Sequence, residues 1–159
     1  MREPNLRPVR DEDGPALIAL IGSIFSEYEG VYIEPDGLDS DLNAYASYIA
    51  SEGGEGFVVE GPGGLLACVS YSQIEGDRYQ LKRIYLSADL RGSGMGLKLL
   101  RHVEGKAKAR GAATMELWSD TRFTRAHRFY EREGYVKQAE TRDLNDSSNT
   151  TEFQFIKQL

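Results

Sequence analysis

A glycine-rich turn at the start of a helix is the segment of this sequence best suited to bind a ligand. The turn follows an apolar strand, precedes a stretch with apolar residues at helical spacing, and consists of Arg91, Gly92, Ser93, Gly94, Met95 and Gly96. Glycines leave backbone N–H groups open to approach, and the first turn of a helix has unpaired N–H groups at the positive end of its dipole. The turn is therefore predicted to bind a pyrophosphate, with Arg91 as a cation at its entrance. A helix start that binds nothing is the alternative.

The spacing of the glycines selects among phosphate-binding motifs. G-x-G-x-x-G and G-x-x-x-x-G-K-[ST] both fail, because each needs a glycine where Leu97 stands. R-x-x-G-x-G fits, with Arg91, Gly94 and Gly96. This pattern resembles the acetyl-CoA signature of the GNAT superfamily of N-acetyltransferases.

A second motif follows at Ala126–Tyr135, which reads AHRFYEREGY. It resembles the A-x-x-[FL]-Y-E-x-x-G-[FY] helix end of the same superfamily. The resemblance implies that Tyr130 stands beside the thioester sulfur and protonates the departing thiolate, a step that a nearby phenol can perform. Alternatively, Tyr130 is a core aromatic that packs with Phe123, Ala126 and Phe129.

Apolar periodicity predicts the elements that position these motifs. The acidic residues 11–13, and then Asp39 or Ser40, are expected to cap the first two helices. The pattern predicts strands at 6–10, 57–60, 65–74, 79–86, 115–118, 135–144 and 151–158, and helices around 17–25, 39–53, 94–110 and 121–132. This order indicates one α/β domain, residues 1–159, whose strand–helix–strand unit at 80–118 is parallel and right-handed.

The resemblance covers nearly the whole chain and implies a GNAT-like fold. That fold has a mixed, twisted, mostly antiparallel sheet, a V-shaped splay between strands 4 and 5, and helices on both faces. Acetyl-CoA is then the co-substrate, and no metal is required. Its pantetheine arm is expected to pair with the backbone at Ile84, Tyr85 and Leu86, where an N–H near Leu86 would polarise the acetyl carbonyl.

The sequence departs from the superfamily pattern at two positions. Gln80 stands near the place where many members carry an acid that deprotonates the amine, and an amide is not a base. Glu27, Glu29 and Asp120 are candidate substitutes, with no ranking among them. Phe123 replaces an asparagine that contacts pantetheine in many members, so that contact is expected to be absent or replaced.

Further charged residues could contact a ligand. Four arginines could reach the 3′-phosphate of coenzyme A or form a solvated helix face; they are Arg122, Arg125, Arg128 and Arg132.

Composition excludes several classes of function. The net charge of −6 argues against nucleic acid as the main partner. Cys68 is the single cysteine and is expected to be buried and inert, while two histidines are too few for most zinc sites. We expect His102 on the polar flank of its helix and His127 in a structural or exposed position. Apolar runs of only a few residues and an N-terminus without a secretion signal predict a cytoplasmic protein that does not associate with membranes.

The acidic residues are concentrated in the first third of the chain. Residues 11–60 contain 12 Asp and Glu and no Lys or Arg. In the resembled family this part of the chain walls the acceptor side of the cleft, so a small cationic or lysine-like amine is the expected acceptor. The alternative is that these acids only keep the protein soluble.

Two classes of function remain from the sequence. The first is an enzyme that transfers an acetyl group from acetyl-CoA to a primary amine by direct attack. The second is a non-catalytic acyl-CoA-binding sensor on the same fold, while an adaptor would leave the glycine turn unexplained. A homodimer is an assembly that the sequence leaves open.

Overall fold

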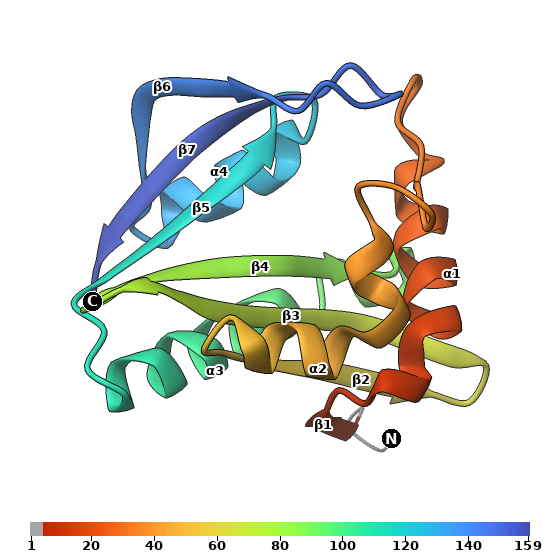
Figure 1. Ribbon diagram of the computed structural model, residues 1–159, viewed down its shortest axis with the longest axis horizontal. Helices are drawn as coiled ribbons and strands as arrows, with labels where there is room; N and C mark the ends of the chain where they lie inside the picture. Colours follow the sequence, from red (N-terminus) through yellow and green to blue (C-terminus); the bar gives the residue numbers. More distant parts are fainter. Residues whose placement is uncertain (1–4) are drawn as a thin grey trace.

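One seven-stranded sheet runs through the molecule, in the order β1-β2-β3-β4-β5-β7-β6 (Figure 1). The computed structural model describes residues 5–159, so most of the N-terminal segment in which we expect no secretion signal lies outside it. Neighbouring strands are antiparallel except β4 and β5, which run parallel as predicted. The strands are β1 (Asn5–Pro8), β2 (Glu55–Gly61), β3 (Gly64–Glu75), β4 (Arg78–Leu86), β5 (Thr114–Asp120), β6 (Val136–Asp143) and β7 (Thr151–Gln158).

Helices cover both faces of the sheet, as expected. One face packs against α1 and α2 through a cluster that includes Val58 and Cys68. The other packs against α3 and α4 through a cluster that includes Leu81 and Leu117. The α-helices are α1 (Gly14–Phe25), α2 (Tyr45–Ser51), α3 (Met95–Ala109) and α4 (Thr124–Arg132), and three 3-10 helices are η1 (Asp11–Asp13), η2 (Ser40–Ala44) and η3 (Ala88–Leu90).

Asp13 and Asp39 stand at the N-cap positions of α1 and η2, as predicted, but neither side chain forms a capping hydrogen bond there. The carboxylate of Asp11 instead accepts the backbone N–H of Ser47, in the first turn of α2, at 2.8 Å. Asp39 accepts the N–H of Glu34 at 2.8 Å and forms an ion pair with Arg83. The expected second helix starts as η2 and becomes α-helical only afterwards.

The sheet splits into a V between β4 and β5. These strands pair only from Arg78 to Gln80 on β4 and from Thr114 to Glu116 on β5. Beyond that point they diverge, as Figure 1 shows, while β4 stays paired with β3 and β5 with β7. The edge of β4 from Leu81 to Leu86 is therefore unpaired by any strand among residues 5–159 on the side that faces β5.

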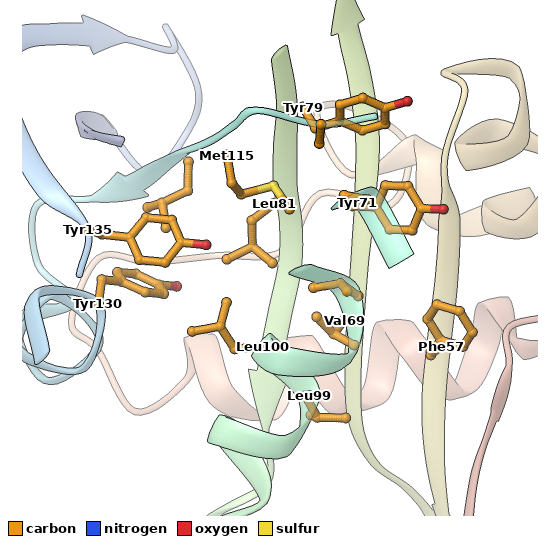
Figure 2. Packing of buried hydrophobic residues seen from close by; sticks show 14 of the residues in the cluster. Phe57, Val69, Tyr71, Tyr79, Leu81, Leu99, Leu100, Met115, Tyr130 and Tyr135 are labelled. Atoms are coloured by element: carbon orange, nitrogen blue, oxygen red, sulfur yellow. The ribbon is translucent and has the colours of Figure 1, made fainter. Parts of the chain in front are cut away.

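Buried apolar side chains hold α3 against the side of the V that contains β3 and β4. Figure 2 shows Leu99 and Leu100 of α3 packed among side chains of the sheet, including Val69 and Leu81. Both leucines have 0% exposure. Full burial of such a side chain contributes about 1.5–3 kcal/mol. This packing helps to set where the glycine turn before α3 lies, since the N-cap residue Gly94 has no side chain to cap the helix.

Candidate active site

The glycine turn presents free backbone N–H groups at the N-terminus of α3. Gly92 and Gly94 have φ angles of 77° and 84°, in the left-handed region that favours glycine. A Cβ at either position would have no heavy atom within 4 Å. The N–H groups of Gly96 and Leu97 have no acceptor among residues 5–159. The turn therefore has the open space and the free donors that a phosphate group needs.

Ser93 holds this turn in shape. Its hydroxyl donates to the carbonyl of Leu90 at 2.5 Å and accepts the N–H of Met95 at 3.3 Å. Its backbone N–H also donates to Leu90 O, at 3.2 Å. The side chain of Ser93 thus links η3 to the first turn of α3.

Arg91 lies beside the turn but already has a partner that the sequence did not indicate. Its guanidinium donates to both carboxylate oxygens of Glu27, each at 2.6 Å. This hydrogen-bonded pair lowers the pKa of Glu27 and raises that of Arg91. A phosphate at the turn would compete with Glu27 for Arg91.

The end of β4 brings its predicted residues next to the turn. Ile84 and Leu86 pack with the α3–α4 face, whereas Tyr85 contacts the ring of Phe25 at 5.8 Å on the other face. A Cβ on Gly96 would lie 3.8 Å from Leu86. The turn and the unpaired edge of β4 therefore form one continuous wall of the V.

Tyr130, on α4, combines a buried ring with an unused hydroxyl. The ring is 6% exposed and packs against Phe129, Tyr135 and Phe155 at centroid distances of 5.8, 6.0 and 5.8 Å. Its hydroxyl forms no hydrogen bond with any residue from 5 to 159 and points toward Leu81 and Leu100 in Figure 2. Burial, then the neighbouring Tyr85, raise the pKa of Tyr130, so the phenol is protonated at neutral pH.

The alternative role of Tyr130, as a core aromatic, requires Phe123 to pack against it, but Phe123 packs elsewhere. Its ring lies 4.8 Å from Tyr28 and 6.1 Å from Phe25, between the end of α1 and the start of α4. An aromatic contact between these helices thus occupies the position of the expected asparagine.

Two of the three candidate bases are held by arginines. Glu27 binds Arg91, as described above. Asp120, which is 6% exposed, accepts the backbone N, Nε and Nη2 of Arg122 at 2.9, 2.9 and 2.8 Å. Glu29 is exposed on the segment after α1.

Sequence reasoning missed a fourth acid, Glu116. It lies on β5 directly opposite Gln80, in the last pair before the strands part. It is 8% exposed and accepts hydrogen bonds from Arg78 at 3.0 Å, Trp118 at 3.2 Å and Gln154 at 3.3 Å. The available signal was a single acid inside the apolar strand MELW at 115–118.

The four arginines considered for the 3′-phosphate do not form one group. Arg125, Arg128 and Arg132 are exposed on α4. Arg122 precedes α4 and is held by Asp120, with further contacts to Gly30 O at 3.4 Å and Thr150 Oγ1 at 3.3 Å.

Two loops meet across the open end of the V. The α1–η2 segment (residues 26–39) rises beside α1 to reach the β6–β7 loop (residues 144–150), as Figure 1 shows. The N–H of Tyr32 donates to the hydroxyl of Ser148 at 2.8 Å, and Arg122 contacts both loops. Side chains thus join two loops that are more than 100 residues apart in the sequence.

Half of the acids on or beside the α1–η2 segment are paired with arginines. Glu27 pairs with Arg91, and Arg83 pairs with Asp39 at 2.9 Å and Asp41 at 2.8 Å. No Lys or Arg among residues 5–159 forms an ion pair with the remaining three, which are Glu29, Glu34 and Asp36. The acidic stretch is therefore less negative at this surface than its composition suggests.

The cysteine and the histidines lie in structural environments. Cys68 is buried, which raises the pKa of its thiol to about 12. His127 is buried, and its Nε2 lies 3.1 Å from Ser119 Oγ. His102 was expected on a polar flank, but its ring packs edge-on against Phe57 at 4.5 Å. His102 therefore lies on the face of α3 that packs against the sheet.

Two features are absent from the part of the chain that the structure describes. Within residues 5–159, no three His, Cys, Asp or Glu side chains lie close enough together to hold a metal ion. None of the helices in this range combines the length and the apolar character needed to cross a membrane.

Solved structures share this fold across their whole length. An acetyltransferase of the GNAT family from Staphylococcus aureus Mu50 matches with a TM-score of 0.83 and 18% identity, covering 99% of each chain. An acetyltransferase from Streptococcus agalactiae 2603 matches with 0.81 and 16%, covering 100% of each. The PaiA N-acetyltransferase from Thermoplasma acidophilum, solved in complex with coenzyme A, matches with 0.73 and 19%, covering 99% of this chain and 100% of that one.

Sequence comparison identifies the family. No curated protein is similar enough in sequence to match. The model of the acetyltransferase (GNAT) family matches residues 18–135, which is most of the chain and includes both the glycine turn and Tyr130. The protein is therefore a member of the GNAT acetyltransferase family.

Proposed function

We propose that the protein transfers an acetyl group from acetyl-CoA to a primary amine by direct attack. The observation that carries this proposal is the unpaired edge of β4 from Leu81 to Leu86. Its Leu86 end lies beside Gly96 in the glycine turn, and its Leu81 end belongs to the same apolar cluster as Tyr130. A linear arm with amide groups can pair with such an edge as an added strand does.

The residues present fit acetyl-CoA. The N–H groups of Gly96 and Leu97 would hold the pyrophosphate, in the open space beside Gly92 and Gly94. Backbone groups from Ile84 to Leu86 would hold the pantetheine arm and polarise the acetyl carbonyl. When bound, acetyl-CoA supplies the thioester that the amine attacks.

Tyr130 is proposed to complete the reaction. The amine nitrogen bonds to the carbonyl carbon, the carbon–sulfur bond breaks, and the hydroxyl of Tyr130 gives its proton to the thiolate. The same burial that raises the pKa of Tyr130 would raise that of a thiol beside it, so proton transfer between them remains feasible. Fixed geometry and carbonyl polarisation would contribute most of the rate.

The acceptor is proposed to be a small cationic amine. Three acids without arginine partners, Glu29, Glu34 and Asp36, support a cation at the α1–η2 segment. The contacts between this segment and the β6–β7 loop favour a small acceptor, because a bulky one would have to separate Tyr32 from Ser148. Both features would affect binding of the acceptor and not binding of acetyl-CoA.

The test is release of free thiol from acetyl-CoA in the presence of an amine panel. The panel contains spermidine, glucosamine and lysine as cations, and neutral or anionic amines as the comparison. We expect thiol release that depends on the amine. Tight binding of acetyl-CoA by calorimetry, with no thiol release for any amine, would instead support the acyl-CoA sensor.

A further inference from the structure

We propose that Glu116 is the general base that removes a proton from the acceptor ammonium, acting through a chain of water molecules along the open edge of β4. This inference rests on the proposed acetyl transfer. The reaction requires a base, because an ammonium has no lone pair with which to attack. Gln80 cannot be that base, since an amide does not take the proton. The structure offers Glu116 in its place, one strand away.

The position of Glu116 follows from strand register. Gln80 and Glu116 are directly paired in parallel strands, so their side chains leave the sheet on the same face. Both residues belong to the last pair before β4 and β5 diverge. The carboxylate of Glu116 therefore lies at the closed end of the V, next to the position where the resemblance expects an acid.

The face that carries Glu116 is opposite the face that carries Tyr130. Leu81 and Leu117, the next residues on the two strands, point into the apolar cluster that contains Tyr130. Side chains alternate along a strand, so Glu116 and Gln80 point the other way. The amine can therefore enter from the side of the V that carries the base, while the thiolate leaves toward the side that carries the acid.

The hydrogen bonds of Glu116 leave it one acceptor site. A carboxylate has about four lone-pair sites. Trp118 and Gln154 both donate to Oε2, and Arg78 donates to Oε1. One site on Oε1 is thus free of donors from residues 5–159. With 8% of the residue exposed, a water molecule can reach it.

The other charged groups on this face are already paired. Asp120, further along β5, is held by Arg122. Glu152 of β7 accepts from Arg142 of β6 at 2.7 Å, and Arg142 lies over the ring of Trp118 at 4.4 Å. Lys82 of β4 donates to the hydroxyl of Tyr48 on α2 at 3.2 Å. Arg78, which also pairs with Glu75, is the cation in contact with Glu116.

The proton balance of the step is complete. Two protons leave the acceptor nitrogen as an ammonium becomes an amide. Glu116 accepts the first before attack and passes it to solvent. The second leaves after the nitrogen–carbon bond forms and passes to solvent, and the phenolate of Tyr130 takes up a proton from solvent to replace the one given to the thiolate.

The experiment compares pH profiles of kcat/KM with acetyl-CoA and the amine of the panel that the wild type acetylates fastest. A base that must be ionised gives an acid limb, along which the rate rises with pH. We expect Glu116→Gln to lower kcat/KM at neutral pH by about 100-fold or more and to remove the limb. Arg78→Gln breaks the same ion pair, keeps the carboxylate and should keep the limb.

Two double variants protect the test against misfolding. Arg78→Gln with Glu116→Gln removes both charges of the pair together, which leaves the net charge of the protein unchanged, and should show the same loss as Glu116→Gln. Gln80→Glu with Glu116→Gln moves the carboxylate across the pair and should restore the limb. The same amine in every profile makes its own ionisation a constant contribution.

The outcomes separate this inference from the proposed function. A wild type that releases no thiol with any amine would contradict acetyl transfer itself. An active wild type would support it. If a folded variant without the carboxylate binds acetyl-CoA normally and keeps both the acid limb and a kcat/KM within about 3-fold of wild type, Glu116 is not the base.

Discussion

The polar groups on the two sides of the V differ in whether they already have partners within the protein. On the side proposed for acetyl-CoA, the groups that matter are backbone N–H groups and one hydroxyl, and they have no partner among residues 5–159. On the side proposed for the acceptor, half of the acids on or beside the α1–η2 segment are already bound by arginines, and so is Asp120. Polar groups without partners are therefore better evidence for the acetyl-CoA side than acidic composition is for the acceptor side.

The largest effect is expected from Tyr130→Phe, which tests whether the unused hydroxyl is functional. The ring contacts remain and no hydrogen bond is lost, so the free energy of unfolding should change by less than about 0.5 kcal/mol. kcat should fall by about 10²–10⁴-fold, with acetyl-CoA affinity close to wild type. Steady-state kinetics and calorimetry measure the two quantities.

Tyr135→Phe is the matched control for this prediction. Tyr135 packs on Tyr130, but its hydroxyl donates to Glu104 at 2.8 Å. Its loss should cost about 1–3 kcal/mol of stability, because a buried hydrogen bond disappears. If Tyr135→Phe slows turnover as much as Tyr130→Phe does, the effect comes from packing and not from proton donation.

Gly94→Asp should give the next largest effect, on acetyl-CoA binding. The substitution places a Cβ and a carboxylate in the open space beside the free N–H groups of α3. We expect acetyl-CoA affinity to fall by at least about 100-fold, or about 2.7 kcal/mol, in calorimetry.

Gly105→Asp provides the comparison, since Gly105 also lies on α3 with nothing near its Cβ position. Gly94→Ala isolates the backbone strain at φ 84°, which costs about 1–2 kcal/mol of stability. Unchanged affinity in a folded Gly94→Asp protein would remove the pyrophosphate from this turn.

The fold and the first side of the V could be predicted because their signals are local. The order of elements follows from periodicity, and the glycine turn and Tyr130 follow from motifs of ten residues or fewer. The pair of Glu27 and Arg91 could not be predicted, because 64 residues separate its members and no spacing links them. The ion pair of Asp39 could not be predicted for the same reason, since a distant arginine binds its carboxylate.

Glu27→Gln tests whether the two sides of the V compete for Arg91. Both side chains are about one-third exposed, and such an ion pair contributes about 0.2–1 kcal/mol. Its loss should free Arg91 for a phosphate and strengthen acetyl-CoA binding by up to about 5-fold. Glu29→Gln, on the same segment but without an arginine partner, should leave acetyl-CoA affinity unchanged. Weaker binding in Glu27→Gln would mean that Glu27 positions Arg91 for the cofactor.

The smallest effect concerns the charge that remains on the acceptor side. Because three of its six acids are paired with arginines, steering of a cation depends on Glu29, Glu34 and Asp36. Salt shortens the Debye length from about 30 Å at 0.01 M to about 3 Å at 1 M. If these acids attract the amine, kcat/KM for a cationic acceptor should fall by about 3- to 10-fold over that range.

The combined variant Glu29→Gln with Glu34→Gln should flatten this salt dependence, because only Asp36 would remain unpaired. Glu12→Gln removes an exposed acid from η1, at the opposite end of α1, and should leave the slope as it is. A helix of the 12 residues of α1 is about 18 Å long, more than a Debye length through most of the salt range. Equal slopes for cationic and neutral amines, or an equal effect of Glu12→Gln, would assign these acids to solubility instead.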